Sequence, residues 1–124
     1  WDVFTTTYQP DNPAIQLLSS EVTATSSHTV IVAQLLVQSE HHTVRGEGNG
    51  PIDALMNGLR DDIGVSFSVR DYHEHALTSG AGASAVAYVE AADESGHTWW
   101  GVGMSSSILD ASLEAVISAA NRRR

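Results

Sequence analysis

The feature that most constrains this fold is a repeat, because two stretches of the sequence have the same order of strand-like and helix-like segments. The tripeptide GEG at residues 46–48 precedes a helical pattern, and GVG at residues 101–103 precedes another. The offset of about 55 residues lies in the range of internal structural repeats. Each tripeptide ends the third of three strand-like segments. The sequence therefore predicts a duplicated β-β-β-α unit, in which two units share a core that neither builds alone.

The first half of the chain combines a two-residue apolar period with a later helical period. The predicted strands span residues 14–25, 29–38 and 43–48, with polar hairpin turns at 26–28 and 39–42. A helix then begins at Pro51 and ends at Gly64, which suits a C-terminal cap. The predicted apolar face of this helix consists of Ile52, Leu55, Met56, Leu59 and Ile63.

The second half repeats this order. Strand patterns cover residues 65–69, 83–91 and 97–104, the segment DYHEHAL at 71–77 is also strand-like, and a helix covers 108–121. Ser107 and Asp110 form a capping box at the start of this helix. The helix has a large apolar face and a small-residue face that lets a sheet or helix come close; the small residues are Ala111, Ala115 and Ala119. Of Trp99 and Trp100, we expect one to face the core and the other to face outward.

The predicted fold class is α+β, with two pseudo-symmetric βββα units packed as one domain, each an antiparallel sheet with one helix. The domain covers residues 14–124, and its repeats cover about 14–64 and 65–124. The cluster QPDNP separates residues 1–13, which we expect to be the end of a preceding linker or subdomain. The first residue is Trp1 and not Met, which suggests a fragment or a processed product.

Composition excludes several classes of function. The net charge of −9 argues against nucleic acid as a partner, because phosphate binding needs clustered Lys and Arg. No apolar run reaches the roughly 18 residues of a membrane span, and we expect no signal peptide, because no charged and then apolar segment opens the sequence. Cysteine is absent, which fits a reducing cytoplasm. We therefore expect a cytoplasmic protein without nucleic-acid or membrane partners.

The glycines before each helix raise the question of a phosphate site. The Walker pattern needs Lys and then Ser or Thr after the last glycine, where Pro51 and Ile52 stand here, and no parallel β-α-β unit supports a dinucleotide site. Glycines permit a tight strand-to-helix turn, and they also expose backbone N–H groups at a positive helix end, which suits a small carboxylate. With apolar walls from Ile52, Val69, Tyr72 and Ile108, the pattern favours a branched amino acid as ligand.

Two histidines raise the possibility of a metal site. His73 and His75 share one face of the predicted strand, Glu74 points away, and His41, His42 or Asp71 are candidates for a further ligand. Because no spacing requires such a ligand, an exposed strand face is the favoured interpretation, and no metal site is predicted. No nucleophile, base and orienting group come together either, so no catalytic residue is predicted.

Three motifs in the same order resemble the C-terminal regulatory domain of 2-isopropylmalate synthase, especially the actinobacterial type. They are RGEGNGPIDAL, DYHEHAL followed by SGAGASAVAYVE, and WWGVGMSSSILDASLEAVISAANR. The resemblance covers residues 14–122, and residues 1–10 resemble the end of the preceding linker subdomain. It implies a parent enzyme that condenses acetyl-CoA with 3-methyl-2-oxobutanoate in leucine synthesis. It further implies an upstream catalytic β/α barrel with a divalent metal, a homodimer, feedback inhibition by L-leucine, and no cofactor in this chain.

The resemblance also implies which residues contact leucine. The matching positions are Gly48, Gly50, Ile52, Val69, Tyr72, Ala76, Ala83, Ala85 and Ile108. On a regular strand, Val69 and Tyr72 would point to opposite faces of the sheet. Since both are expected to contact leucine, we expect a bulge near Arg70 and Asp71.

The sequence departs from the family at one position. The family usually has an acidic residue before the alanine that matches Ala83, whereas Gly82 precedes it here. If that carboxylate holds the ammonium of the ligand, affinity is weaker here, or Asp53 or Asp71 replaces it. Two alternatives therefore stay open: a citramalate-synthase-type domain that responds to isoleucine, and a dimerisation module with a degenerate ligand site.

Overall fold

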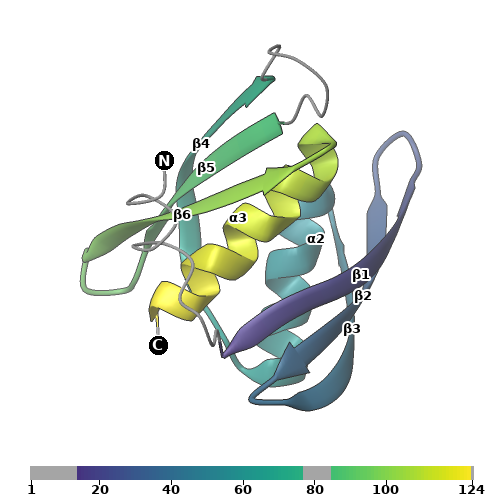
Figure 1. Ribbon diagram of the computed structural model, residues 1–124, viewed down its shortest axis with the longest axis horizontal. Helices are drawn as coiled ribbons and strands as arrows, with labels where there is room; N and C mark the ends of the chain where they lie inside the picture. Colours follow the sequence, from purple (N-terminus) through teal and green to yellow (C-terminus); the bar gives the residue numbers. More distant parts are fainter. Residues whose placement is uncertain (1–13, 77–84, 124) are drawn as a thin grey trace. The chain divides into compact units, whose positions relative to one another are not determined.

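The computed structural model describes residues 14–76 and 85–123. These residues belong to two compact units, and the sequence boundary between them falls after Ser66. We call them the N-terminal unit (residues 14–66) and the C-terminal unit (residues 67–123). Each has a three-stranded antiparallel sheet followed by a helix (Figure 1), which confirms the predicted α+β fold of two βββα units. Residues 1–13 and Ala83, for which the sequence made predictions, lie outside the described residues.

The sheet of the N-terminal unit has the order β1-β2-β3, with β1 at Ile15–Ala24, β2 at Thr29–Val37 and β3 at Glu40–Gly48. Alternate residues of the central strand β2 form the core, and Ile31, Ala33 and Leu35 are fully buried. The two-residue period of the sequence thus predicts correctly which face of β2 is covered.

The turn between β2 and β3 differs from the prediction. Gln38 and Ser39 have positive φ angles of 51° and 70°, as in a two-residue type I′ hairpin turn. The strand therefore starts at Glu40, and His41 and His42 are strand residues, although residues 39–42 were expected to form the turn. The sequence gives no signal for this turn, because left-handed positions are usually filled by Gly, Asn or Asp.

The first helix, α2, spans Pro51–Gly58 and continues as a π-helical segment at Leu59–Ile63. It ends at Gly64 with φ of 75°, which confirms the predicted C-terminal cap. Leu55 and Leu59 are fully buried, while the other residues of the predicted apolar face are partly buried.

The π-helical segment gives Asp62 a role that the sequence did not predict. Its carboxylate accepts a hydrogen bond from the backbone N–H of Arg45 in β3, at 2.9 Å. Asp62 therefore satisfies a backbone donor of an edge strand, which otherwise invites pairing with another chain.

The sheet of the C-terminal unit has the order β4-β5-β6, with β4 at Ser68–Ala76, β5 at Ala85–Ala92 and β6 at Thr98–Ser105. Helix α3 follows at Ile108–Arg123, and the N–H of Asp110 donates to the Ser107 hydroxyl at 3.1 Å, as expected for the cap. Trp99 is 9% exposed and Trp100 is 36% exposed, which confirms that one ring faces the core and the other faces outward.

Helix α3 lies unusually close to β6. Its small residues Ala111, Ala115 and Ala119 are fully buried. A Cβ on Gly101 would lie 2.3 Å from the carbonyl oxygen of Ala115, and one on Gly103 would lie 2.2 Å from that of Ala111. The predicted small-residue face therefore meets a strand that has no side chains at the contact. Across the described residues, no helix is long and apolar enough to span a membrane.

The N-terminal unit has the same kind of close contact between a helix and a glycine of the third strand. A Cβ on Gly46 would lie 1.8 Å from the carbonyl oxygen of Ala54 in α2. Gly46 approaches the carbonyl oxygen of Ala54, and Gly103 approaches that of Ala111, which has the corresponding place in α3. Gly46 is therefore the structural equivalent of Gly103, whereas the glycine spacing predicted Gly101. These glycines allow a helix to pack directly on a strand, in addition to any role in the turn.

Glu114, on α3, is expected to weaken folding at neutral pH. Burial first, and then the negative charge of Asp110, raise the pKa of Glu114 above its ordinary value. The folded state therefore binds more protons than the unfolded state between the two pKa values, so stability rises as pH falls through that window and is lowest above it. Glu114→Gln should raise the melting temperature at pH 7, and this gain should vanish at about pH 3, where an ordinary Glu is protonated too.

The control for this comparison is Glu94→Gln, which removes the same charge from an exposed position. Melting curves recorded by circular dichroism at the two pH values measure the difference between the variants. If Glu114→Gln lowers the melting temperature at pH 7 while Glu94→Gln does not, the ionised carboxylate is stabilising and the account of its burial is wrong.

Candidate functional site

The predicted carboxylate-binding turn lies at the N-terminus of α2. Gly50 is extended, with φ of −161° and ψ of 177°, and a Cβ there would meet nothing within 4 Å. Within the described residues, the N–H groups of Gly50, Ile52 and Asp53 have no hydrogen-bond acceptor. The turn thus offers free backbone donors at the positive end of a helix.

The carboxylate of Asp53 limits what this turn can bind. It accepts the N–H of Asn49 at 3.0 Å, and a Cβ on Gly48 would lie 2.4 Å from its Oδ2 atom. Gly48 therefore leaves room for Asp53, which places a negative charge beside the free N–H groups. An anionic ligand fits here only if it also carries a positive group or binds on the side away from Asp53.

The bulge predicted in β4 is confirmed. The pairing of β4 with β5 shifts between Val69 and Asp71, so that Val69 pairs with Ala91 and Tyr72 pairs with Val89. Val69 and Tyr72 therefore lie on the same face of the sheet, and both are partly buried. This is the face that packs against α3, because the β6 partner of Val89 is Gly101.

The other predicted residues of the C-terminal unit lie at the end of the same face or at the start of α3. Ala76 is exposed and pairs with buried Ala85, and Ile108, the first residue of α3, is 41% exposed. The structure thus brings Val69, Tyr72, Ala76 and Ala85 to one face of one sheet, while Gly48, Gly50 and Ile52 belong to the N-terminal unit. Their role in ligand binding stays a prediction.

Tyr72 is the centre of a hydrogen-bonded group that joins β4 to α3. Its hydroxyl contacts a carboxylate oxygen of Glu74 and the hydroxyl of Ser112. An ionised carboxylate only accepts, so Tyr72 donates to Glu74 and Ser112 donates to Tyr72. The Ser112 hydroxyl also lies 2.8 Å from the carbonyl oxygen of Ile108, an alternative acceptor for the same proton. Burial, and then the bond to Glu74, raise the pKa of Tyr72 above its ordinary value, so the hydroxyl keeps its proton at neutral pH.

Sequence reasoning missed Glu74 and Ser112 as members of this group. Glu74 was correctly expected to point away from the face of His73 and His75, which is the face opposite Tyr72. Ser112 gives a weak signal, because it is a polar residue among the buried residues of an apolar helix. Only the distance between β4 and α3 links the two residues, and no pattern in the sequence reports that distance.

Neither carboxylate that was expected to replace the missing acidic residue is available on the face of Tyr72. Asp53 belongs to the N-terminal unit and holds the N–H of Asn49. Asp71 accepts the N–H of Tyr72 at 2.8 Å and contacts His73 at 3.1 Å. The first of these bonds, and then the second, lower the pKa of Asp71 below its ordinary value. Asp71 pairs with Glu90, which places it on the opposite face of the sheet from Tyr72.

The histidines of β4 lie on that opposite face. His73 stacks on Trp100 with ring centroids 6.3 Å apart, and His75 meets Tyr88 edge-on at 6.4 Å. In the part of the chain that the structure describes, no group of three His, Cys, Asp or Glu residues could hold a metal ion. The histidines thus contribute aromatic contacts to an exposed sheet face.

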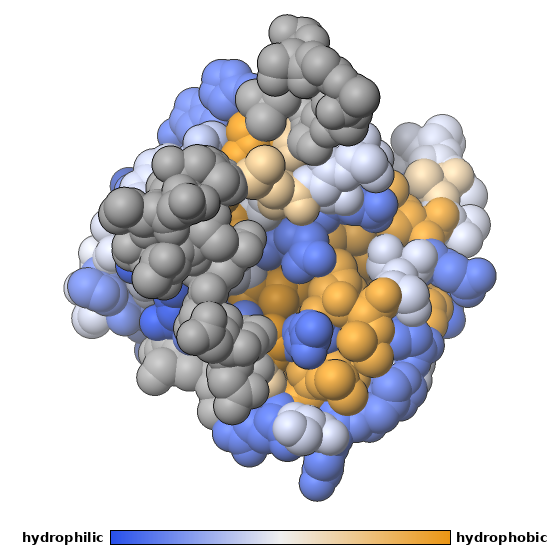
Figure 2. Space-filling model, in the orientation of Figure 1, coloured by the Kyte–Doolittle hydropathy of each residue, from blue (hydrophilic) through white to orange (hydrophobic). Residues whose placement is uncertain are grey.

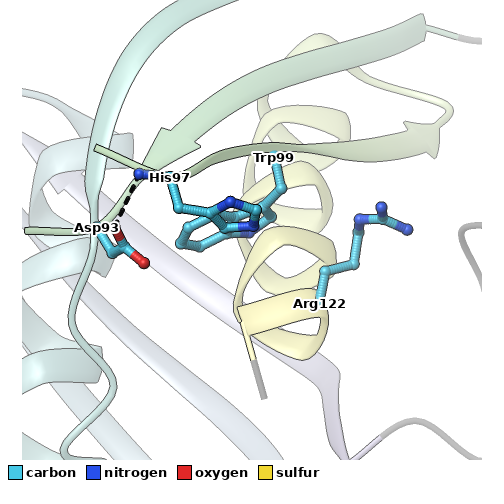
Figure 3. Close-up of a pocket in the computed structure, with 4 residues that line it drawn as sticks. All are labelled: Asp93, His97, Trp99 and Arg122. Carbon is cyan, nitrogen blue, oxygen red and sulfur yellow. Dashed lines mark hydrogen bonds between the residues drawn. The ribbon is translucent and has the colours of Figure 1, made fainter. Parts of the chain in front are cut away.

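The structure also reveals a pocket that the sequence did not predict. It has a volume of about 180 Å³ and lies at the end of the C-terminal unit where β5 turns into β6, lined by Asp93, His97, Trp99 and Arg122. His97 stacks on Trp99 at 5.9 Å, with Asp93 and Arg122 on opposite sides of the stacked pair (Figure 3). The carboxylate of Asp93 holds the turn, because one of its oxygens accepts the hydroxyl and N–H of Ser95 and the N–H of His97. These bonds, that of the Ser95 hydroxyl first, lower the pKa of Asp93.

The duplicated βββα architecture and the paired glycine contacts define a class of small α+β domains in which each helix packs directly on a glycine-bearing strand. Within this class, the chain belongs to the LeuA allosteric (dimerisation) domain family, which it matches over residues 1–123. The family match and the relatives named 2-isopropylmalate synthase confirm the resemblance that the three motifs indicated.

Three relatives illustrate the match, and all are named 2-isopropylmalate synthase. The protein of Parafrankia sp. is 44% identical over 98% of this chain and 22% of its own length. The protein of Thermobifida fusca is 41% identical over 98% of this chain and 21% of its own length. The protein of Agrobacterium fabrum is 44% identical over 75% of this chain and 16% of its own length. The chain thus spans about a fifth of the length of the first two relatives.

Proposed function

We propose that this chain binds L-leucine and transmits feedback inhibition to the catalytic part of a 2-isopropylmalate synthase. The observation that carries the proposal is the turn before α2, where three backbone N–H groups have no acceptor within the described residues. Within the C-terminal unit, the bulge in β4 brings an apolar and a hydroxyl-bearing side chain, Val69 and Tyr72, to one face. Free N–H groups suit the carboxylate of an amino acid, and aliphatic walls suit its side chain. The family description as an allosteric domain supports the same role.

Inhibition requires two arrangements of the protein that bind leucine with different affinity, because equal affinity for both would shift nothing. A coupling of about 1–3 kcal/mol is typical for such a site. We propose that the two arrangements belong to a homodimer, and that the catalytic barrel with its divalent metal lies in another part of the parent enzyme. No cofactor is proposed for the chain itself. A cytoplasmic location fits the absence of cysteine.

Exposed apolar residues support the proposal of a dimer. Figure 2 displays apolar residues over β1 and β2 on the visible face of the molecule. Leu18, at the bulge of β1, is 48% exposed, and Trp100, Ile108 and Leu109 are further large apolar residues in contact with solvent. Large apolar residues that stay exposed in each unit are candidates for an interface with a second copy of the chain. Sedimentation velocity should therefore yield about twice the mass of one chain.

Isothermal titration of the chain with leucine, isoleucine and valine tests the proposal. We expect saturable heat with leucine, and binding about 10-fold or more weaker for the other two, because one displaced or missing methylene in an apolar pocket is worth about 1–3 kcal/mol. Tighter binding of isoleucine would favour the citramalate-synthase-type alternative. A folded dimer that gives no heat with any of the three at millimolar concentration would leave only the dimerisation module.

A further inference from the structure

We propose that the pocket beside the β5–β6 turn binds a linear zwitterion, a small molecule whose ammonium and carboxylate groups are separated by several methylenes. The described residues that line it all belong to the C-terminal unit. Its volume of about 180 Å³ corresponds to about six water molecules at about 30 Å³ each. The pocket uses none of the residues proposed to bind leucine, so this inference goes beyond the proposed function and does not depend on it.

Asp93 supplies the acceptor for the ammonium group. One oxygen of its carboxylate accepts three hydrogen bonds, from the N–H and the hydroxyl of Ser95 and from the N–H of His97. Within the described residues nothing donates to the other oxygen, and the side chain lines the pocket. The three bonds hold the carboxylate in place before a ligand arrives, and they favour its ionised form. The pocket therefore has a fixed negative charge on one side.

Arg122 supplies the donor for the carboxylate group. Figure 3 shows Asp93 and Arg122 on opposite sides of the stacked His97 and Trp99 rings, whose centroids are 5.9 Å apart. Arg122 already interacts with another group, but a guanidinium has more N–H donors than one partner uses. A ligand that meets both charges has to extend past the rings. Because the ammonium and the carboxylate of an α-amino acid are attached to one carbon, such a ligand reaches only one of the two side chains.

The stacked rings form the apolar wall between the two charges. The indole N–H of Trp99 is bonded to the carbonyl oxygen of Ala119, so the ring offers carbon surface to the pocket and not a donor. His97 covers part of that surface and is itself exposed. Methylene groups that lie against the rings are removed from water, which favours binding. The wall thus suits the chain that joins the two charged ends of the ligand.

The internal repeat indicates that the fold does not require this group of side chains. In the N-terminal unit the corresponding strands are joined by two residues, Gln38 and Ser39, whereas residues 93–97 join β5 to β6. The equivalence of Gly46 and Gly103 also places His42 where Trp99 stands. The N-terminal unit therefore forms the same kind of sheet without a carboxylate in the turn and without the indole.

A series of zwitterions of increasing length tests the proposal on the intact chain: glycine, 3-aminopropanoate, 4-aminobutanoate and 6-aminohexanoate. We expect saturable shifts of the ¹H–¹⁵N signals of the Asp93 and His97 amides and of the Trp99 indole. Affinity should rise by about 10-fold or more from glycine to the longest member, because a second charge-assisted hydrogen bond forms only when both charges are reached. Hexanoate and hexylamine, with one charge each, should bind about 10-fold more weakly than 6-aminohexanoate.

Two variants assign the charges. Asp93→Asn keeps an oxygen that can hold the turn and removes the negative charge, and Arg122→Gln removes the guanidinium. Each should weaken the binding of 6-aminohexanoate by about 10-fold, the effect of one charge-assisted hydrogen bond. The matched controls are Glu94→Gln and Arg60→Gln, which remove the same charges from exposed positions and should bind the ligand as wild type does.

The inference is wrong if glycine binds as tightly as 6-aminohexanoate, or if hexanoate does, because the ligand then does not join the two charges. It is equally wrong if 6-aminohexanoate causes no saturable shift well above about 1 mM, the range expected for so few atoms. Neither outcome affects the proposed leucine site, which the amide signals of Gly50 and Ile52 report separately.

Discussion

The substitution Gly46→Ala is expected to destabilise the N-terminal unit by at least about 3 kcal/mol, which is larger than the usual effect of overpacking. The added Cβ would lie 1.8 Å from the carbonyl oxygen of Ala54 and 2.8 Å from the backbone nitrogen of Gly58. Both are backbone atoms of α2, so no side-chain rotation relieves the clash. The helix has to move away from β3, and the buried contacts of Leu55 and Leu59 are weakened.

The matched control for this substitution is Gly50→Ala, because Gly50 is extended and a Cβ there meets nothing within 4 Å. This variant should unfold within about 1 kcal/mol of wild type. Urea unfolding followed by circular dichroism measures both variants. Equal unfolding midpoints for Gly46→Ala and wild type would mean that α2 does not lie as close to β3 as the structure has it.

The second large effect is expected for Trp99→Ala, which should remove about 3–5 kcal/mol of stability. Trp99 is nearly buried, and its indole N–H donates to the carbonyl oxygen of Ala119 at 2.9 Å. Its ring also packs against Phe67, with centroids 5.8 Å apart. Truncation leaves a cavity next to the last turns of α3 and removes a partner from a helix carbonyl.

Trp100→Ala is the control, since it changes the same residue type one position away on the exposed face. Its ring stacks on His73, and the expected loss is below about 1.5 kcal/mol. Trp99→Phe should lie between the two, because it keeps most of the buried area and loses the hydrogen bond. Similar losses for Trp99→Ala and Trp100→Ala would contradict the assignment of the two rings to opposite faces.

Much of this fold could be predicted because local patterns and tertiary packing agree. The alternating residues of β2 are the buried ones, Pro51 and Gly64 mark the ends of the first helix, and Ser107 caps the second. The bulge in β4 could be predicted because Val69 and Tyr72, three residues apart, had to lie on the same face of the sheet. Each of these features depends on residues close together in the sequence.

The features that were missed depend on contacts between distant segments. The π-helical segment at Leu59–Ile63 places Asp62 at the edge of β3, and no helical period reports such a widening. The left-handed turn at Gln38 and Ser39 is imposed by the register of two strands. The match of Gly46 with Gly103 follows from which helix carbonyl each glycine approaches.

In the candidate site, too, the contacts that were missed join segments far apart in the sequence. The resemblance supplied Tyr72 and the glycine turn, but Glu74 was set aside because it points away from the histidines. Its bond to Tyr72, and the bond of Tyr72 to Ser112, became evident only when β4 and α3 were placed together.

The central proposal is that leucine binds through the free N–H groups of the turn before α2. Recording the ¹H–¹⁵N spectrum of the labelled chain during a leucine titration tests it most directly. The account predicts saturable shifts of the amide signals of Gly50, Ile52 and Asp53. Shifts confined to the Asp93 and His97 pocket, or no shifts at millimolar leucine, would contradict it.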